Sequence, residues 1–406
     1  MLNKKGVREL AYVVNIDEIR PIEGADRVEL AIIGGWQVMV RKGQFKPGDP
    51  AVYFEIDSKV PETSVFEFLA PKHYKVKTQK YFKGKVLSQG LLMSAADFGW
   101  HINSDNNIVN NEGIVFHAND ESRFLTEELG VKYAVEEDNI RKANSIDKYK
   151  TMAARHPELF KKAPIRWLMR RSWGKKLLFI FFGNKKKSRN WPAWVVKTDE
   201  ERCQNLTGLL FGDGIWHNEV WIATEKIDGT STTFTIKRGR GKKYEFYVCS
   251  RNVVFDKPDK KCFYDSNVYL EMASKYDIEN ILVDMLKHYP EADWITIQGE
   301  TFGNKIQNRD YSIGGHDFLA FNLIMSNTGR WNTLDMRREL EKYDIQTVPI
   351  VQEEYTLPDS IEALLEYADG KSKLDGEPRE GIVFRSLDGE KSFKAVSNSY
   401  LLKFHS

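Results

Sequence analysis

The sequence has little cysteine and none of the residue spacings that bind zinc. Its three cysteines, Cys203, Cys249 and Cys262, lie too far apart for a Cys-x-x-Cys pair, and an odd number leaves no complete set of disulfides. The eight histidines are scattered, without a His-x-x-x-His pair. These absences argue against a zinc site and against a disulfide-bonded secreted scaffold, so we expect a reducing, cytoplasmic compartment.

Long hydrophobic runs are missing as well. The longest, from Leu177 to Phe182, is too short to span a bilayer, and the N-terminus has no apolar core of a signal peptide. We therefore expect a soluble, intracellular protein with no membrane partner, acting as a monomer. The net charge is only +2, so any surface for a polyanion must come from local clustering.

Acidic residues are absent from residues 159–198, where basic residues are frequent. A block of one sign repels itself unless an anion lies close, and the interspersed Trp167, Trp173 and apolar run 177–182 would let helices pack while offering cations to a phosphate backbone. A membrane-surface helix is the alternative, and Lys185–Lys187 also suits a linker or a targeting signal. The basic residues are Lys161, Lys162, Arg166, Arg170, Arg171, Lys175, Lys176, Lys185, Lys186, Lys187, Arg189 and Lys197.

The chain is long enough for two or three domains, and its first part predicts a small β-barrel. Five short strand patterns are separated by turn residues such as Gly34–Gly35, which is typical of an OB-type barrel. The patterns are residues 10–14, 27–33, 36–40, 51–56 and 89–93. The strings at residues 24–31, 40–43 and 47–54 also resemble those of tRNA-binding OB domains.

A basic loop precedes the last of these strands. Lysines between Lys72 and Lys85 alternate with Tyr74, Tyr81 and Phe82. Cations for phosphates interleaved with stacking rings favour contact with nucleic acid, and the alternative is a scaffold barrel with a solvated loop.

The most informative stretch surrounds Lys226, which stands two residues before Asp228–Gly229. The apolar run 220–223 predicts a strand that Asp-Gly ends, and residues 232–236 predict the next strand. Lys226 would then lie at a sheet rim facing a pocket. A neutral amine attacks phosphorus well, and burial or a neighbouring cation can lower its pKa enough to supply one. The alternative is a surface hairpin with a solvated lysine.

The remainder of the chain predicts an α+β domain with polar residues at strand ends. Asp277 can cap a helix that ends near Pro290, and further helices are predicted near 334–343 and 360–368. Predicted strands are residues 294–298, 317–324, 381–385 and 392–396. These polar residues are Arg251, Glu300, Asn322, Glu380 and Lys394, and the aromatic Phe321 stands beside Asn322.

In type and order, these residues after Lys226 and Asp228 resemble the motif series of covalent nucleotidyltransferases, the ATP-dependent polynucleotide ligases and mRNA capping enzymes. Residues 197–205, Lys-Thr-Asp-Glu-Glu-Arg-Cys-Gln-Asn, resemble more narrowly the RNA ligases of the Deinococcus/Naegleria type, which carry an N-terminal OB domain. The resemblance implies an antiparallel-sheet nucleotidyltransferase (ATP-grasp-like) domain behind an OB barrel. We expect an OB domain at 1–115, a basic helical connector at 116–195 and the adenylyltransferase domain at 196–406.

The resemblance implies an ATP-dependent RNA ligase that seals 3′-hydroxyl and 5′-phosphate ends through a lysyl-AMP on Lys226, in RNA repair. Thr224 and Glu225 would flank the nucleotide. The other expected roles are divalent-metal (Mg²⁺ or Mn²⁺) ligands at Asp228, Glu300 and Glu380, an α-phosphate contact at Lys394, ribose or phosphate contacts at Glu300 and Arg251, adenine stacking on Phe321, and a terminal-phosphate or RNA contact at Arg202.

The last motif departs from the family, whose ligases often carry Lys-x-Lys where this chain has Lys394-Ala395-Val396. Either Lys394 acts alone or Lys403 reaches the site. Because faces alternate along a strand, a two-residue turn at Asp388–Gly389 would separate Glu380 from Lys394, so we predict a connection of three or five residues pairing Phe384 with Lys394.

Three other functions remain open: a capping guanylyltransferase, a DNA ligase, and a non-enzymatic RNA-binding protein with a degenerate ligase domain. We expect neither of the first two, because the sequence ends at Ser406, just after the last motif and without their usual C-terminal OB domain. The intact motif residues argue against the third.

Overall fold

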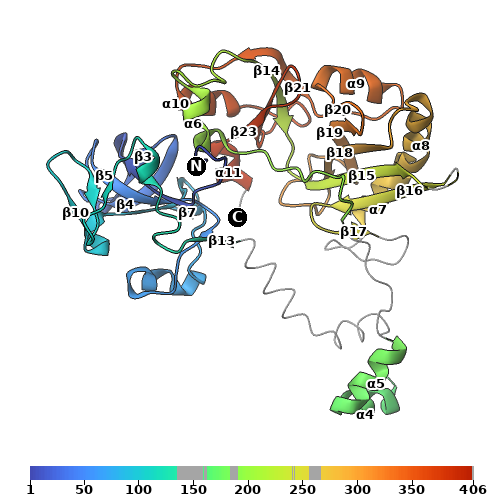
Figure 1. Ribbon diagram of the computed structural model, residues 1–406, viewed down its shortest axis with the longest axis horizontal. Coiled ribbons are helices and arrows are strands. Elements are labelled where there is room, and N and C mark those ends of the chain that lie inside the picture. Colours follow the sequence, from blue (N-terminus) through green and yellow to red (C-terminus); the bar gives the residue numbers. More distant parts are fainter. Residues whose placement is uncertain are drawn as a thin grey trace.

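The computed structural model describes residues 1–134, 159, 162–182, 191–239, 241, 243–255 and 267–404. Figure 1 shows an N-terminal β-rich domain (blue to cyan) beside a larger C-terminal domain in which two sheets lie next to each other.

The N-terminal domain is built from small antiparallel sheets around two apolar cores. One sheet has the order β1-β5-β9 and the other β2-β3-β4, and Trp36, Tyr53 and Ala31 fill the core between them. All five predicted strands are present. They are β1 Ala11–Asn15, β3 Val28–Ile33, β4 Trp36–Arg41, β5 Pro50–Phe54 and β9 Leu91–Met93, and β2 Glu18–Pro21 is a further strand that was not predicted. This is the predicted OB-type fold.

Shorter elements complete this domain and correct one predicted boundary. They are β6 Ser58–Lys59, η1 Ser64–Lys72, β7 Gln79–Tyr81, β8 Val86–Ser88, η2 Ala95–Phe98, β10 His101–Ile102, β11 Ile108–Val109, β12 Val115–Phe116, η3 Glu121–Arg123 and β13 Lys132–Tyr133. Strand β13 pairs with β6, and Leu125 and Val131 lie in the same core as Val13. The end expected at residue 115 is therefore too early, because apolar residues beyond it complete the core.

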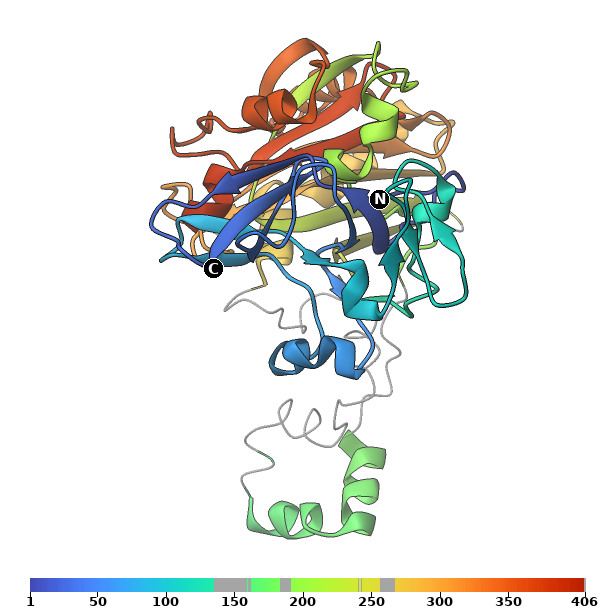
Figure 2. The ribbon, with the colours of Figure 1, turned by 90° about the vertical axis from the view of Figure 1, so that its left-hand side faces the viewer.

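Two helices represent the basic connector in the described part of the chain. They are α4 (Ala163–Met169) and α5 (Ser172–Phe182), and they lie away from both domains in Figures 1 and 2. The predicted helix from about residue 138 and the Lys185–Lys187 run lie outside the described residues.

The C-terminal domain contains two antiparallel sheets. The four-stranded sheet has the order β21-β14-β22-β23, and the six-stranded sheet has the order β17-β16-β15-β18-β19-β20. The strands are β14 Val220–Lys226, β15 Thr230–Arg238, β16 Tyr244–Ser250, β17 Val254–Phe255, β18 Trp294–Gly303, β19 His316–Met325, β20 Gly329–Arg330, β21 Ile350–Thr356, β22 Gly381–Ser386 and β23 Ser392–Val396.

Helices cover one side of each sheet. Apolar residues of α7 (Val268–Lys275), α8 (Ile278–His288) and α9 (Thr333–Glu341) share a core with the six-stranded sheet. Those of η4 (Cys203–Asn205), α6 (Thr207–Leu210) and α10 (Ile361–Ala368) share one with the four-stranded sheet. Asp277 precedes α8 as predicted but does not cap it, because it has a φ of 49° and its carboxylate bonds the Asn280 side chain.

The chain passes from one sheet to the other immediately after Lys226. The strands predicted on either side of Asp228–Gly229 exist, yet β14 belongs to the four-stranded sheet and β15 to the six-stranded one. The alternative of a surface hairpin is therefore wrong. Lys226, the last residue of β14, lies at the junction of the two sheets.

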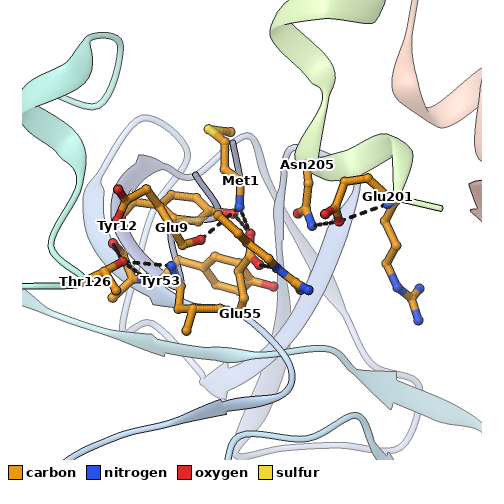
Figure 3. A network of polar contacts seen from close by, with 12 residues as sticks. Met1, Glu9, Tyr12, Tyr53, Glu55, Thr126, Glu201 and Asn205 are labelled. Atoms are coloured by element: carbon orange, nitrogen blue, oxygen red, sulfur yellow. Dashed lines mark hydrogen bonds and ion pairs between the residues drawn. The ribbon is translucent and has the colours of Figure 1, made fainter. Parts of the chain in front are cut away.

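The OB domain packs against the C-terminal domain over a specific surface. Leu87 of β8 is fully buried with Val396 of β23 and Leu401 of α11 (Asn398–Phe404). Lys80 Nζ donates to the carbonyl of Leu402 over 2.9 Å. Figure 3 shows a network inside the OB domain, beside the 201–205 segment, in which the buried carboxylate of Glu55 accepts bonds from the Met1 amino group and from Tyr12.

Candidate active site

A cavity of about 300 Å³ opens where the two sheets of the C-terminal domain meet. Its walls come from the end of β14, the start of β15, strands β18, β19, β22 and β23, and the segment before η4. Seven predicted residues line it: Thr224, Glu225, Lys226, Arg251, Glu300, Phe321 and Lys394. Glu380 is bonded to Lys226 at its edge. The topology thus brings together residues spread over 170 positions of sequence.

Lys226 is held by a carboxylate within this cavity. Its Nζ donates to Oε1 of Glu380 over 2.6 Å, and the lysine side chain is 26% exposed. Burial lowers the pKa of Lys226, but Glu380, Glu300 and Asp228 raise it by more, so that the pKa lies above its ordinary value. The carboxylates therefore keep the amine protonated, which is the opposite of the lowered pKa expected from burial or a neighbouring cation.

The strands β22 and β23 pair Val383 with Lys394, so the predicted pairing of Phe384 with Lys394 is wrong. The five-residue connection between Ser386 and Ser392 does match the prediction. Glu380 nevertheless reaches Lys226, because Gly381, the first residue of β22, has a φ of +154° and breaks the alternation of faces there. A Cβ at Gly381 would lie 2.1 Å from the carbonyl oxygen of Ala395.

Asp228 lies just beyond Lys226 and is fixed by two tyrosine hydroxyls. Its backbone N–H donates to the Tyr311 hydroxyl over 2.7 Å, and the Tyr400 hydroxyl donates to its Oδ2. Neither tyrosine was among the predicted site residues. Tyr311 lies between Glu300 and Phe321, and Tyr400 follows the last motif. Neither resembles a motif residue, so sequence reasoning had no signal for them.

The pKa values of Glu300 and Lys394 are shifted toward each other. Burial raises the pKa of Glu300 to about 8, although Lys226 opposes this shift. Burial together with the charge of Lys226 lowers the pKa of Lys394 to about 8. Lys394 Nζ also lies 3.5 Å from Asp199 Oδ1. Near neutral pH the cavity therefore holds a protonated carboxyl and a cation that gives up its proton readily.

Phe321 enters the cavity through an irregularity of the sheet. On β18 and β19, Gln298 pairs with Asn322 and Gly299 with Ala320, which leaves Phe321 as the extra residue of a β-bulge. The ring lies with Val348 and Val383 on the apolar side of the cavity. This part of the cavity suits a flat aromatic ligand.

The segment before η4 supplies residues that the sequence prediction missed. Thr198, Asp199 and Glu200 all line the cavity, although only Arg202 of that string had been assigned a role. Asp199 Oδ2 accepts from Arg251 over 2.6 Å. Glu200 Oε1 pairs over 3.0 Å with Arg385, which also lines the cavity. The sequence signal that Thr198, Asp199 and Glu200 shared was their position close to Arg202, which had been assigned a role.

Arg202 and Lys403 lie outside the cavity lining. The Arg202 backbone bridges to Lys394, while its guanidinium lies 5.6 Å from the centre of the Trp36 ring in the OB domain and its Nη1 is buried without a partner. Lys403 pairs with Glu377 at a separate cavity. Val396, at the position of the family's second lysine, packs against Leu87.

Thr224 and Glu225 have structural contacts as well as places in the lining. The Thr224 hydroxyl donates to the carbonyl of Val383 over 3.1 Å, and Glu225 Oε2 accepts the backbone N–H of Lys373 over 2.8 Å. These bonds tie β14 to β22 and to the loop before it.

A divalent cation fits the carboxylates only in part. In the part of the chain that the structure describes, no group of three side chains forms a preassembled metal site. Oε2 of Glu380, however, is buried without a hydrogen-bond partner beside Lys226. Mg²⁺ is commonly bound by one or two carboxylates that leave its remaining positions to water and substrate phosphates, and this arrangement suits such a cation.

Comparisons with known proteins find matches for both domains. Residues 219–396 match a family model described as RNA ligase, and residues 10–95 match one described as an OB-fold domain. No curated protein matches the sequence. Among solved structures, a Naegleria gruberi RNA ligase with PPi is 24% identical, with a TM-score of 0.62, over 98% of this chain and 99% of that chain.

Two mutants of the Naegleria gruberi enzyme align as extensively. One, with ATP and Mn, is 24% identical at a TM-score of 0.63 over 98% of this chain and 100% of that chain. Another, with AMP and Mn, is 24% identical at a TM-score of 0.62 over 98% of this chain and 99% of that chain. At this identity the similarity establishes a shared fold across both domains.

Proposed function

From an OB-fold domain at residues 10–95 and an RNA ligase domain at residues 219–396, we propose that this chain is an ATP-dependent RNA ligase. It joins an RNA 3′-hydroxyl to a 5′-phosphate through a lysyl-AMP intermediate. The observation that carries the proposal is the position of Lys226, 2.6 Å from Glu380 in a cavity that Glu300, Phe321 and Lys394 also line.

Three displacements at phosphorus make up the reaction. The neutral Lys226 amine attacks the α-phosphorus of ATP, and the N–P bond forms as the P–O bond to pyrophosphate breaks. The 5′-phosphate of RNA then takes AMP from the lysine. Finally the 3′-hydroxyl attacks that 5′-phosphate, forming the new phosphodiester and releasing AMP. Catalysis consists mainly of positioning and of neutralising charge.

Lys226 must lose its proton before the first step. In the free cavity three carboxylates raise its pKa. Glu380, Glu300 and Asp228 are the residues that would hold a divalent cation, Mg²⁺ or Mn²⁺. A bound cation would offset charge on these carboxylates and on the phosphates of ATP. With their charge offset, the carboxylates no longer hold the proton on Lys226, and its amine becomes the nucleophile.

Each of the remaining cavity residues would contact a different part of the nucleotide. Phe321, supported by Val348 and Val383, forms the apolar wall against which the adenine ring stacks. Arg251 and Glu300 lie where they can bond the ribose. Lys394, on β23, provides positive charge for the α-phosphate as negative charge develops there.

RNA would lie across two basic surfaces outside the cavity. The first is the loop between Lys72 and Lys85 of the OB domain. The second is the α4–α5 pair, where Lys162, Arg166, Arg170, Arg171 and Lys176 are exposed. The Arg171 guanidinium lies 3.8 Å from the centre of the Trp167 ring, and Trp167 and Trp173 are 48% and 55% exposed. Exposed rings beside cations suit single-stranded RNA.

The proposal places the activity in the cytoplasm, with the chain acting as a monomer. Cys203 and Cys249 are free and buried, which fits a reducing compartment. In the described part of the chain no helix is both long enough and apolar enough to cross a bilayer.

A sealing assay with matched nicked duplexes tests the function. Duplexes that differ only in having RNA or DNA on the 3′-hydroxyl strand are incubated with ATP or GTP and Mg²⁺ or Mn²⁺. We expect sealing with ATP and an RNA 3′-hydroxyl strand, and none after Lys226→Ala. Sealing of the all-DNA duplex at an equal rate would indicate a DNA ligase, and use of GTP alone would indicate capping chemistry. RNA binding without nucleotide transfer would indicate a degenerate domain.

A further inference from the structure

Asp228 is held in place by a residue that lies outside the ligase motifs. The Tyr400 hydroxyl donates to Asp228 Oδ2, and Tyr400 is only 2% exposed. Tyr311 holds the backbone of the same residue. A hydrogen bond from a buried hydroxyl to a carboxylate is among the stronger kinds in proteins, so Tyr400 fixes the orientation of the Asp228 side chain.

Tyr400 belongs to α11, and α11 is fixed to the C-terminal domain on one side. The Ser397 hydroxyl bonds Asp369 and accepts the backbone N–H of Tyr400 over 3.0 Å. Asn308 Nδ2 donates to the carbonyl of Phe404 over 3.1 Å. The start and the end of the helix are therefore both anchored.

The other side of α11 carries the OB domain. Leu401 packs with Leu87 of β8, and Lys80 of β7 donates to the carbonyl of Leu402. Tyr400, Leu401 and Leu402 are consecutive, so the residue that contacts Asp228 lies next to the two that contact the OB domain. Figure 1 shows α11 between the two domains.

We propose that Tyr400 is a positioning residue for Asp228. We also propose that α11 couples the docking of the OB domain to the nucleotide site. When the OB domain is seated on α11, Tyr400 holds Asp228 turned toward an incoming cation. When the contact between the OB domain and α11 weakens, the hydrogen bond from Tyr400 to Asp228 weakens as well, and the cation is bound more weakly. This proposal rests on the proposed function, because it assigns the cation to the adenylation site.

The test separates cation affinity from catalysis. Lys226→Ala is introduced first so that no adenylate forms, and Mn²⁺ binding is then titrated by electron paramagnetic resonance in the presence of ATP. Tyr400→Phe removes only the hydroxyl and is expected to weaken Mn²⁺ binding about tenfold, the lower end of the effect of losing an outer-shell partner. Lys80→Met removes the bond from the OB domain and is expected to weaken Mn²⁺ binding in the same direction by a smaller factor.

Tyr53→Phe is the matched control. It also removes a buried hydroxyl that donates a hydrogen bond, to the carbonyl of Gln89 over 3.0 Å, but lies inside the OB domain. If Tyr400→Phe binds Mn²⁺ as tightly as Tyr53→Phe does, the proposed role of Tyr400 is wrong. Unchanged affinity in Lys80→Met would overturn the coupling to the OB domain.

A second measurement keeps this inference separate from the proposed function. With Lys226 intact, Tyr400→Phe should raise the Mn²⁺ concentration that half-saturates adenylation more than it lowers the rate at saturation. If the unaltered chain forms no lysyl-AMP at any Mn²⁺ concentration, the proposed function fails, whatever the resonance titration shows. If it does form lysyl-AMP and Tyr400→Phe lowers only the saturating rate, the positioning role fails alone.

Discussion

Val383 and Lys394 lie directly opposite each other on the antiparallel strands β22 and β23. Strict alternation from this pair would turn Glu380 away from the cavity, yet Glu380 bonds Lys226 within it. Gly381 resolves the conflict, because its φ of +154° is open to glycine and strained for other residues. The Lys226–Glu380 contact thus depends on one backbone conformation as well as on charged side chains.

Gly381→Ala should therefore impair both folding and adenylation. Its Cβ would lie 2.1 Å from the Ala395 carbonyl oxygen, at a φ that L residues rarely adopt. We expect a loss of roughly 2 kcal/mol or more in the free energy of unfolding, measured by urea denaturation. We also expect adenylation at 25 °C, where most of the protein remains folded, to fall by at least about tenfold.

Gly376→Ala is the control for this substitution. Gly376 also has a positive φ, +75°, but a Cβ there would have no atom within 4 Å. Its substitution should cost about 1 kcal/mol and leave adenylation unchanged. Equal rates for the two alanine variants would show that Glu380 does not depend on Gly381.

The pH dependence of adenylation should report Lys394. Its pKa is lowered to about 8, mainly by burial and by Lys226, so it carries its charge below that pH and loses it above. The pKa of Lys226 is raised, so the rate should first increase with pH as its amine loses the proton. Above about pH 8 Lys394 loses its charge, and this loss offsets the further gain in neutral Lys226, so the rate should level off.

Lys394→Arg isolates this levelling-off, because a guanidinium keeps its charge throughout this range. We expect single-turnover adenylation with Mg²⁺ to keep rising above pH 8 in the variant, even if its maximal rate is lower. Superimposable profiles after scaling would mean that Lys394 does not titrate in the reaction.

The α4–α5 pair should contribute to RNA affinity and not to adenylation. Replacing Arg166, Arg170, Arg171 and Lys176 by glutamine removes four exposed cations, and the slope of log affinity against log salt for single-stranded RNA should shrink by up to about 3. Adenylation without RNA should stay unchanged. The control replaces Lys287, Arg337, Arg338 and Lys342, near α8 and α9, with glutamine.

An equal change of slope in the control would indicate a general effect of net charge. Unchanged RNA binding together with new binding to anionic vesicles would instead support the membrane-surface alternative for this helix pair.

Much of the fold and the identity of several cavity residues could be predicted from the sequence. Strand patterns and turn residues are local signals, and they located five strands of the OB domain and both strands beside Asp228–Gly229. Lys226 and Glu300 could be named because residue type and order carry a motif even when distances are unknown. Their roles follow from chemistry that few other side chains perform.

The features that the sequence did not reveal are set by contacts across the fold. Nothing local shows that β14 and β15 enter different sheets, that a bulge turns Phe321 into the cavity, or that Gly381 redirects Glu380. Tyr400 follows the last motif by six positions and meets Asp228 only through the docking of α11. Arg202 and Lys403 were placed by resemblance, and the structure gives them other neighbours.

The most direct measurement is mass spectrometry of the intact protein after incubation with ATP and Mg²⁺ and denaturation. We predict the addition of one AMP per chain, mapped by peptide analysis to Lys226, released by acid, absent from Lys226→Ala and retained by Lys371→Ala, an exposed lysine outside the cavity. A protein that gains no AMP under these conditions, or that carries it on another residue, would contradict the account.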